Sequence, residues 1–464
     1  MTSENPTYHC NKSYIIKWCI TILAPLLISF IPTNEVYTNT IRLFLVITLA
    51  IILCIAFELL NLLIPSILLP ALYVLSGVAP ANLAYGSWTS TLPWSILGAY
   101  LLANVLDESG LLKRVSYWCI LRTGGSYLGL LYGILTAGLI VSLLASGMGK
   151  MVIAILCVGI CKAFNLKVSK ETGIILLVGA ISTITPALFF YNPVGMSLVL
   201  TGAQSVIPDL TITWLSFFKA NFPYIFFLYF FVYSVYKVFK PKLEFDGKSY
   251  FETELQNLGK ISLNEKKAFF IVAVLLIFLL TQNFHHIDLN WGFILIPFLA
   301  YFPGIHIGSQ KAIDTLPYTM VFFATTCVAI GNVAGSLGLG QIISQGLLPI
   351  LSQVGTTGAL MLVCLLGVVL NLLLTPLAIL GAFTGPITQI ALDLGLNPLG
   401  VLYALKSSID QVFFPYEYVA YLIFFSFGYI RMKDFTAIMG FKTLLHFIFL
   451  FAVMIPWWKI IGVL

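Results

Sequence analysis

A few charged side chains interrupt long apolar stretches of this 464-residue sequence, and their chemistry is considered first. Lys150 lies in an apolar run, with Gly147 and Gly149 just before it. A charge near the centre of a bilayer costs about 2.5–3.5 kcal/mol on insertion scales, so it usually faces a cavity or a partner. Lys150 is therefore predicted to be a fixed cation that attracts an anion or replaces a sodium ion. The glycines would let backbone N–H groups reach the same ligand. The alternative is a lysine that extends to the membrane surface.

Glu417 lies in a second apolar run and has three interpretations, one of which is a helix-end residue with no role. Burial disfavours the charged form of a carboxyl group, so Glu417 is a candidate for carrying a proton in coupled transport. It could equally be a permanent partner of Lys150 or Lys406. Lys406 and Asp410 are spaced i,i+4, which predicts a structural ion pair on one helix. Glu58 is also assigned a structural role.

Neutral polar residues at predicted turns complete the candidate site. Non-helical backbone at membrane depth is tolerated only beside protein or a cavity. These residues are therefore predicted to line a substrate or ion site, and for each one a hydrogen bond back to the helix backbone is the alternative. They are Ser146, Thr183, Thr185, Asn192, Thr375 and Thr384.

The composition indicates the solvent in which these residues must be held. Hydrophobic residues make up 59% of the chain, charged residues 9%, and mean hydropathy is +1.00. A soluble domain carries roughly 25% charged residues. Long unbroken apolar runs exclude the alternating pattern of a membrane barrel. We predict an all-α membrane protein with lipid around it. The net charge of +6 lies mostly in loops between spans and does not indicate a nucleic-acid partner.

The apolar stretches predict about eleven transmembrane helices, at about 20 residues per span. Two further regions, 127–161 and 357–395, are too long for one span and contain small residues, which favours two re-entrant hairpins. The expected spans lie near residues 18–32, 41–57, 59–76, 93–107, 172–194, 220–237, 268–284, 291–302, 318–334, 400–428 and 437–457.

Loop charges orient this layout. With a cytoplasmic N-terminus, the Lys- and Arg-rich loops all lie inside if hairpin 127–161 returns to the side it entered from. This pattern predicts a multi-pass protein of the inner membrane. The inside loops are 108–126, 162–171, 237–267 and 429–435; the expected outside loops are 195–219 and 285–290.

The two halves of the chain echo each other. Residues 92–114 and 316–341 both begin Leu-Pro-aromatic and pass through Asn-Val to Gly-Leu, and each precedes a hairpin region. With five spans per half, the second copy would insert upside down, and the substrate would bind at midplane where the halves meet. The predicted organisation is 1–40 as tail and first span, 41–237 as first repeat, 238–267 as cytoplasmic linker and 268–464 as second repeat.

Four segments carry a family resemblance: FELLNLLIPSILLPALYVLSG (57–77), ILGAYLLANVLDESGLLKRV (96–115), LNPLGVLYALKSSIDQVFFP (396–415) and FFSFGYIRMKDF (424–435). In this order they resemble the divalent-anion/sodium symporter family of dicarboxylate, citrate and sulfate carriers, within the ion-transporter superfamily. The resemblance implies a secondary transporter of small anions. It also implies a homodimer whose scaffold part forms the interface while a transport part with both hairpins moves as an elevator.

The chain departs from that family at the expected ion sites. The family places Ser-Asn-Thr at each hairpin tip, whereas here the first tip reads Ser146-Gly147-Met148-Gly149-Lys150 and the second Thr375-Pro376-Leu377-Ala378. The family's Gly-Thr-Pro-Pro-Asn turns are replaced within Ser182–Pro193 and at Glu417–Tyr421. Either sodium or a proton therefore remains a candidate coupling ion. A sodium-independent exchanger or proton-coupled carrier is the alternative to a sodium symporter.

Other classes of protein are less well supported by the sequence. No phosphate-binding loop or nucleophile motif occurs, so we predict that the chain is not an enzyme and holds no cofactor. His285, His286 and Asp288 share one loop, but we predict no metal site. Most of the eight cysteines lie in apolar segments and are expected to pack there. A transport-inactive sensor or assembly protein is the third alternative.

Overall fold

The computed structural model consists of helices and connecting turns, with no strand among the residues that it describes. These residues are 12–57, 59–124, 126–147, 149–241, 248–339, 342, 353, 355–372 and 374–464. Glu58, which was assigned a structural role, lies outside them.

The described part of the first half of the chain consists of α-helices and the two short 3₁₀ segments η1 and η2. Their bounds are α1 (Lys12–Ser29), α2 (Asn39–Ala56), α3 (Leu63–Leu75), α4 (Ala81–Ala84), η1 (Gly86–Thr89), α5 (Leu92–Glu108), α6 (Leu111–Arg122), α7 (Tyr127–Leu144), α8 (Lys150–Ala163), α9 (Lys170–Ile184), η2 (Thr185–Leu188), α10 (Pro193–Gln204), α11 (Trp214–Asn221) and α12 (Pro223–Phe239).

The described part of the second half also consists of α-helices and short 3₁₀ segments, and it includes a π-helical segment, η5, just before Pro456. Its elements are α13 (Lys248–Asn257), α14 (Leu263–Leu280), α15 (Gln282–His285), α16 (Leu289–Leu295), η3 (Ile296–Tyr301), α17 (Gln310–Asp314), α18 (Tyr318–Ser336), α20 (Gly355–Asn371), α21 (Pro376–Asp393), α22 (Pro398–Ser408), η4 (Pro415–Glu417), α23 (Val419–Ser426), α24 (Met432–Phe449), η5 (Leu450–Met454) and α25 (Ile455–Ile460).

The prediction of an all-α protein with many apolar helices is confirmed. Over the described residues, five helices are long and apolar enough to cross a membrane, or six if α11 and α12, bent by 43°, form one span. Shorter apolar helices, among them α3 and α20, supply further candidates. The count of about eleven spans and the inversion of the repeats stay predictions. The five candidates are Asn39–Ala56, Tyr127–Leu144, Lys170–Gln204 (α9, η2 and α10 taken together), Tyr318–Ser336 and Met432–Ile460 (α24, η5 and α25 taken together).

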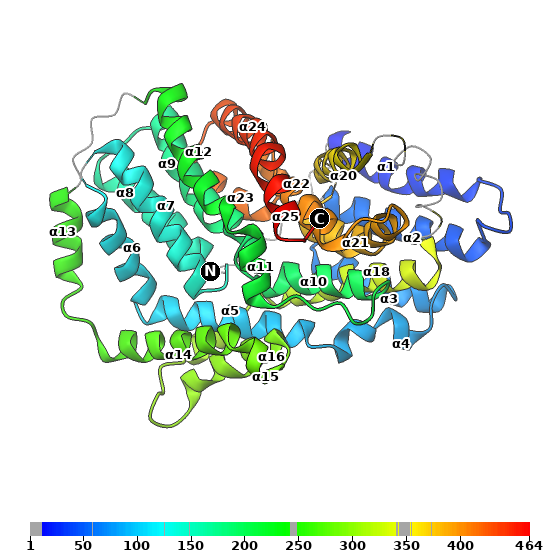
Figure 1. Ribbon diagram of the computed structural model, residues 1–464, viewed down its shortest axis with the longest axis horizontal. Coiled ribbons are helices and arrows are strands. Elements are labelled where there is room, and N and C mark those ends of the chain that lie inside the picture. Colours follow the sequence, from blue (N-terminus) through cyan, green and yellow to red (C-terminus); the bar gives the residue numbers. More distant parts are fainter. Residues whose placement is uncertain are drawn as a thin grey trace.

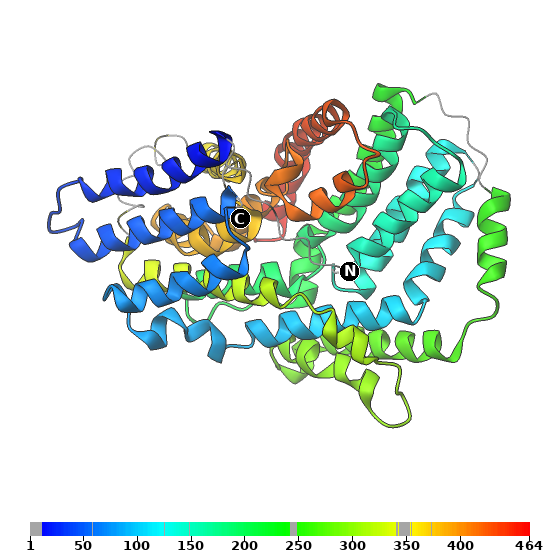
Figure 2. The ribbon, with the colours of Figure 1, turned by 180° about the vertical axis from the view of Figure 1, so that it is seen from behind.

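The helices form two groups joined by a central one (Figure 1). Helices α7, α8, α9 and α12 lie together on one side, and α1, α2, α20 and α21 lie on the other. Helices α22 to α25 stand between them, and α5 runs below, where it contacts α16, α10 and α18; the reverse view shows the same arrangement (Figure 2). This arrangement brings both predicted hairpins to the centre from opposite sides.

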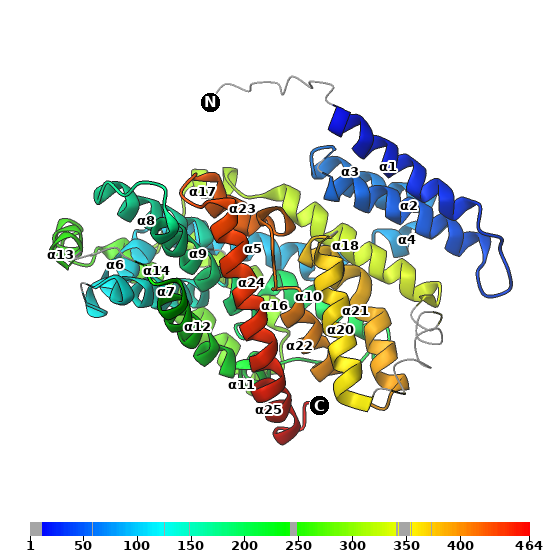
Figure 3. The same cartoon turned by 90° about the horizontal axis from the view of Figure 1, so that it is seen from above.

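Each predicted hairpin region folds as two helices joined by a short turn (Figure 3). In 127–161, α7 ends at Leu144 and the chain reverses through Ser146 and Gly147, both in the left-handed region with φ of 50° and 79°. Glycine adopts this conformation readily, while serine rarely does. In 357–395, helix α21 begins at Thr375, whose hydroxyl accepts from Ala378 N, and Pro376 occupies the first helical position.

Two segments predicted as continuous spans, 172–194 and 400–428, are broken, which corrects the sequence-based layout. Helix α9 ends at Ile184 and continues only as the 3₁₀ turn η2, because Pro186 cannot donate the next helical hydrogen bond. Helix α22 likewise ends at Ser408, and α23 begins only at Val419, after the proline-containing turn η4. Both hairpins are therefore followed by a helix with a break.

Two segments predicted as loops, 108–126 and 195–219, are largely helical. Helix α6 occupies the first and packs against α7 with Leu112 and Ile120, both at most 2% exposed. Its lysine and arginines lower its hydropathy, so it does not resemble a span. Helix α10 occupies the start of the second, where Asn192 caps it and Pro193 begins it.

The linker 238–267 is attached to α6 by Arg114. Its guanidinium donates to Glu265 at 2.7 Å and to the backbone oxygens of Leu258 and Gly259 at 3.1 and 2.9 Å. Glu265 precedes the expected span 268–284. Burial alone would raise the pKa of Glu265, but hydrogen bonds from Arg114 and Ser262 outweigh it and hold that pKa below 4.5.

Arg114→Gln is expected to destabilise the protein by about 2 kcal/mol, because several charge-assisted hydrogen bonds are lost. Since the folded-state pKa of Glu265 is depressed, its stabilising contribution is present above pH 4.5 and is lost as pH falls through the folded pKa. The apparent melting temperature of the wild type should therefore fall more steeply than that of the variant below pH 4.5. The control is Arg122→Gln, because the Arg122 guanidinium lies over the Trp118 ring, 5.2 Å from its centre, and not beside Glu265. Parallel pH profiles for wild type and Arg114→Gln would contradict the assignment.

Candidate functional site

A small cavity of about 60 Å³ lies where the two hairpin turns meet the two helix breaks. It brings together four of the residues predicted for the site, and the turn after Thr375 contributes its neighbours Pro376 and Leu377. The lining includes Gly147, Lys150, Thr183, Asn192, Gly195, Pro376, Leu377, Lys406, Asp410 and Tyr418.

Lys150 is the first residue of α8 and lines this cavity. Its Nζ lies 6.0 Å from the centre of the Tyr418 ring. Over the described residues, no carboxylate oxygen lies within 4.0 Å of that nitrogen, so neither Glu417 nor another acidic side chain pairs with it. The ammonium is thus held at the cavity by an aromatic face and keeps its charge available for a ligand.

The first hairpin turn is held against the first helix break by Asn192. Its Nδ2 donates to Ser146 O at 3.2 Å, while its Oδ1 accepts from Gly195 N at 3.1 Å and caps α10. A Cβ on Gly147 would lie 2.8 Å from Nδ2 of Asn192, so the close approach requires glycine. Gly149 instead faces Val141 of α7 and serves the packing of the hairpin.

The threonines predicted as site residues divide into two groups. Thr183 and Thr384 donate back to their own helices, at 3.0 Å to Ala180 O and 2.6 Å to Leu380 O. Thr183 still lines the cavity, whereas Thr384 packs away from it against Gly202. Thr185 donates at 2.9 Å to Oδ2 of Asp410.

The predicted ion pair between Lys406 and Asp410 does not form. Asp410 Oδ2 instead accepts from Lys442 Nζ at 2.6 Å, and Lys406 Nζ donates to Ala187 O. The i,i+4 spacing fails to bring them together because Asp410 lies beyond the end of α22, where the backbone is no longer helical. Lys442 was not singled out from the sequence, although a lone lysine in the apolar span 437–457 was the available signal.

Glu417 is buried but pairs with neither Lys150 nor Lys406. Its Oε1 accepts from Phe413 N and Phe414 N at 3.1 and 2.8 Å, which holds the turn before α23. Within the part of the chain that the structure describes, Oε2 has no hydrogen-bond partner. The interpretation of Glu417 as the permanent partner of a lysine is therefore wrong, while the other two stay predictions.

Three helix N-termini face the cavity. Lys150 opens α8, Gly195 lies in the first turn of α10, and Pro376 opens α21. Each N-terminus carries a partial positive charge that favours an anion, although side-chain caps already accept from Gly195 N in α10 and from Ala378 N in α21. Hairpins and breaks thus direct positive charge to one point, although they come from distant parts of the sequence.

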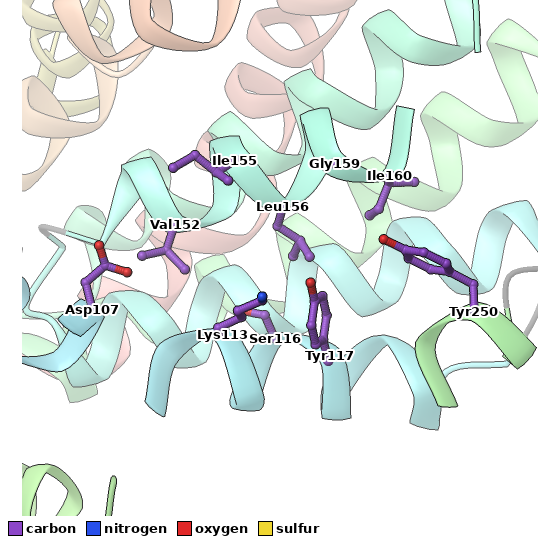
Figure 4. Close-up of a pocket in the computed structure, with 10 residues that line it drawn as sticks. All are labelled: Asp107, Lys113, Ser116, Tyr117, Val152, Ile155, Leu156, Gly159, Ile160 and Tyr250. Carbon is purple, nitrogen blue, oxygen red and sulfur yellow. The ribbon is translucent and has the colours of Figure 1, made fainter. Parts of the chain in front are cut away.

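A larger cavity of about 190 Å³ lies elsewhere, between α6, α8 and α13 (Figure 4). Lys113 and Tyr117 lie below it, Val152 and Leu156 above it, Tyr250 enters from the right and Asp107 lies at the left end. Its size alone does not make it the better candidate, since it contains none of the predicted site residues and has one acidic and one basic group. At the smaller cavity, residues of both hairpins meet and positive charge exceeds negative charge.

Comparisons with known proteins agree with this architecture. The chain resembles the YdaH transporter of Alcanivorax borkumensis with a TM-score of 0.53 at 16% identity, covering 82% of this chain and 87% of that one. It also resembles MtrF of Neisseria gonorrhoeae, described among antimetabolite efflux pumps, with a TM-score of 0.55 at 12% identity over 97% and 95% of the two chains. At these identities the likeness is one of fold. No curated protein sequence matches the chain.

Residues 12–464 match the family model described as the sodium:sulfate symporter transmembrane region. This match covers nearly the whole chain and agrees with the apolar helices of the structure. The chain therefore belongs to the sodium:sulfate symporter family and is a multi-pass membrane protein, a secondary transporter of anions.

Proposed function

We propose that the cavity between the two hairpin turns is the anion-binding site of this transporter. The observation that supports it is the charge of the lining. Lys150 and Lys406 contribute two ammonium groups, and the one carboxylate in the described lining, that of Asp410, is already paired with Lys442 at 2.6 Å. Together with three helix N-termini, this leaves an excess of positive charge that a small anion would balance.

The proposed substrate is a compact anion, either a di- or tricarboxylate or an inorganic oxyanion. A cavity of about 60 Å³ favours the smaller members of these classes. Backbone N–H groups at the helix starts would bind its oxygens, and Lys150 would supply the charge that neutralises it. Sodium and a proton are the candidate coupling ions, and exchange of one anion for another is the alternative to both.

The transport cycle we propose is an elevator movement in a homodimer. The part that carries both hairpins and both breaks would slide against a scaffold that forms the dimer interface. We place the protein in the inner membrane with its N-terminus in the cytoplasm, divided into two inverted repeats at the linker 238–267. The basic residues of α6 and of this linker, which lie side by side, support this orientation.

Lys150→Ala should weaken anion binding about tenfold or more, since loss of one poorly solvated charge contact readily exceeds 1.4 kcal/mol. The measurement is the apparent melting temperature against mono-, di- and tricarboxylates, sulfate and phosphate, because a ligand that binds the native state raises it. The wild type should shift with one class of anion and the variant should not.

Lys113→Ala, at the larger cavity, is the matched control and should keep the shift. A shift retained in Lys150→Ala but lost in Lys113→Ala would move the anion site to the cavity of Figure 4. No shift with any anion would favour the transport-inactive alternative, in which the chain acts as a sensor or assembly partner.

A further inference from the structure

The two helix breaks expose backbone carbonyl groups inside the protein. Where a helix stops, its last carbonyls lose their partners and carry partial negative charge. In transporters with broken helices, such carbonyls coordinate the coupling cation. The breaks after α9 and after α22 are therefore the places where a sodium ion would be expected.

Lys442 occupies the second break. Its ammonium is fully buried and lies 2.8 Å from Asp410 O, 2.6 Å from Asp410 Oδ2 and 3.4 Å from Gln411 Oε1. The Thr185 hydroxyl completes the surroundings of the same carboxylate oxygen at 2.9 Å. A backbone carbonyl, a carboxylate and a side-chain amide oxygen are the ligand types that hard cations take in proteins.

Lys406 occupies the first break in a similar way. Its ammonium donates to Ala187 O, in the 3₁₀ turn that follows α9, and lies 5.6 Å from the centre of the Phe217 ring. The residue is 6% exposed. Each break thus has a lysine ammonium on its backbone carbonyls, one supplied by α22 and the other by α24.

We infer that Lys406 and Lys442 are tethered cations that replace the coupling sodium at the two helix breaks, so that this member of the family transports its anion without sodium. The inference rests on the proposed anion site. A sodium ion at either break would have to displace a covalently attached ammonium, and the Asp410 carboxylate that would bind it is already neutralised. The residues present therefore do not fit the ion that the family name implies.

The test compares sodium with choline at equal ionic strength. The apparent melting temperature of the wild type should be the same in both chlorides, and uptake of the active anion into proteoliposomes should not slow when choline replaces sodium. Lys442→Ala and Lys406→Ala should unfold at lower temperature and lose uptake. Methylammonium chloride should restore part of both, because it can occupy the vacated ammonium position.

Lys267→Ala is the matched control, since Lys267 Nζ also donates to a backbone oxygen, that of Ile305 at 2.6 Å, but away from the breaks. Methylammonium should not change the melting temperature of Lys267→Ala.

A sodium-dependent stabilisation of the wild type would overturn the inference. If Glu417→Gln then abolished that stabilisation, the sodium site would lie at Oε2 of Glu417. If the alanine variants fail to fold, the wild-type comparison decides alone. Failure of the proposed anion site would give a different result: no anion would shift the apparent melting temperature in either sodium or choline chloride.

Discussion

Lys442→Met is expected to destabilise the protein by about 3–5 kcal/mol, because it leaves the Asp410 carboxylate buried without its counter-charge. The ammonium is completely buried and Asp410 is 7% exposed, so water cannot replace the lost contact. The backbone carbonyl of Asp410 loses a donor at the same time. Thermal unfolding in detergent should show a fall in apparent melting temperature on the order of 5 °C.

The matched variant removes both charges. Asp410→Asn with Lys442→Met leaves no uncompensated ion, and replacement of both members of a buried pair is often nearly neutral. The double variant should therefore recover most of the stability that the single variant loses, while Asp410→Asn alone should be destabilised through the buried Lys442. Additive losses in the double-mutant cycle would show that the two groups do not act as a pair.

Gly98→Ala is expected to cost about 3 kcal/mol or more, a large effect for one methyl group. Helix α5 passes so close to α16 that a Cβ on Gly98 would lie 1.8 Å from the backbone oxygen of Phe293. A backbone atom cannot rotate away as a side chain can, so the two helices would have to separate. Helix α5 also contacts α10 and α18, so its displacement would reach those two helices as well.

The control for this substitution is Gly440→Ala in the interior of α24, where no atom lies within 4 Å of the added Cβ. Alanine there should stabilise the helix by about 0.5–1 kcal/mol, because glycine loses more backbone entropy on folding. Apparent melting temperatures of the two variants should move in opposite directions. Equal, small shifts would mean that α5 and α16 are less closely packed than the structure shows.

Hydropathy by itself determined the class of protein, its helical nature and the positions of both hairpin regions. An apolar run such as 318–334 can hydrogen-bond all of its own backbone groups in lipid only as a helix. The location of such helices therefore follows from local sequence. The order of motifs also identified the family. Lys150, Gly147 and Asn192, which line one cavity, could be singled out because polar or flexible residues stand out against an apolar background.

Only the tertiary structure decided which charges meet. The i,i+4 spacing predicted an ion pair between Lys406 and Asp410, but helix α22 ends between these two residues. Asp410 instead accepts from Lys442, which lies more than thirty residues further along the chain. The hydropathy profile also ran 172–194 and 400–428 together as continuous spans, because it does not register the hydrogen bond that a proline removes; the family resemblance alone placed a turn within each segment. Long-range partners of a buried charge are chosen by the packing of whole helices. Local sequence can therefore predict that Asp410 needs a cation, while the fold determines that Lys442 supplies it.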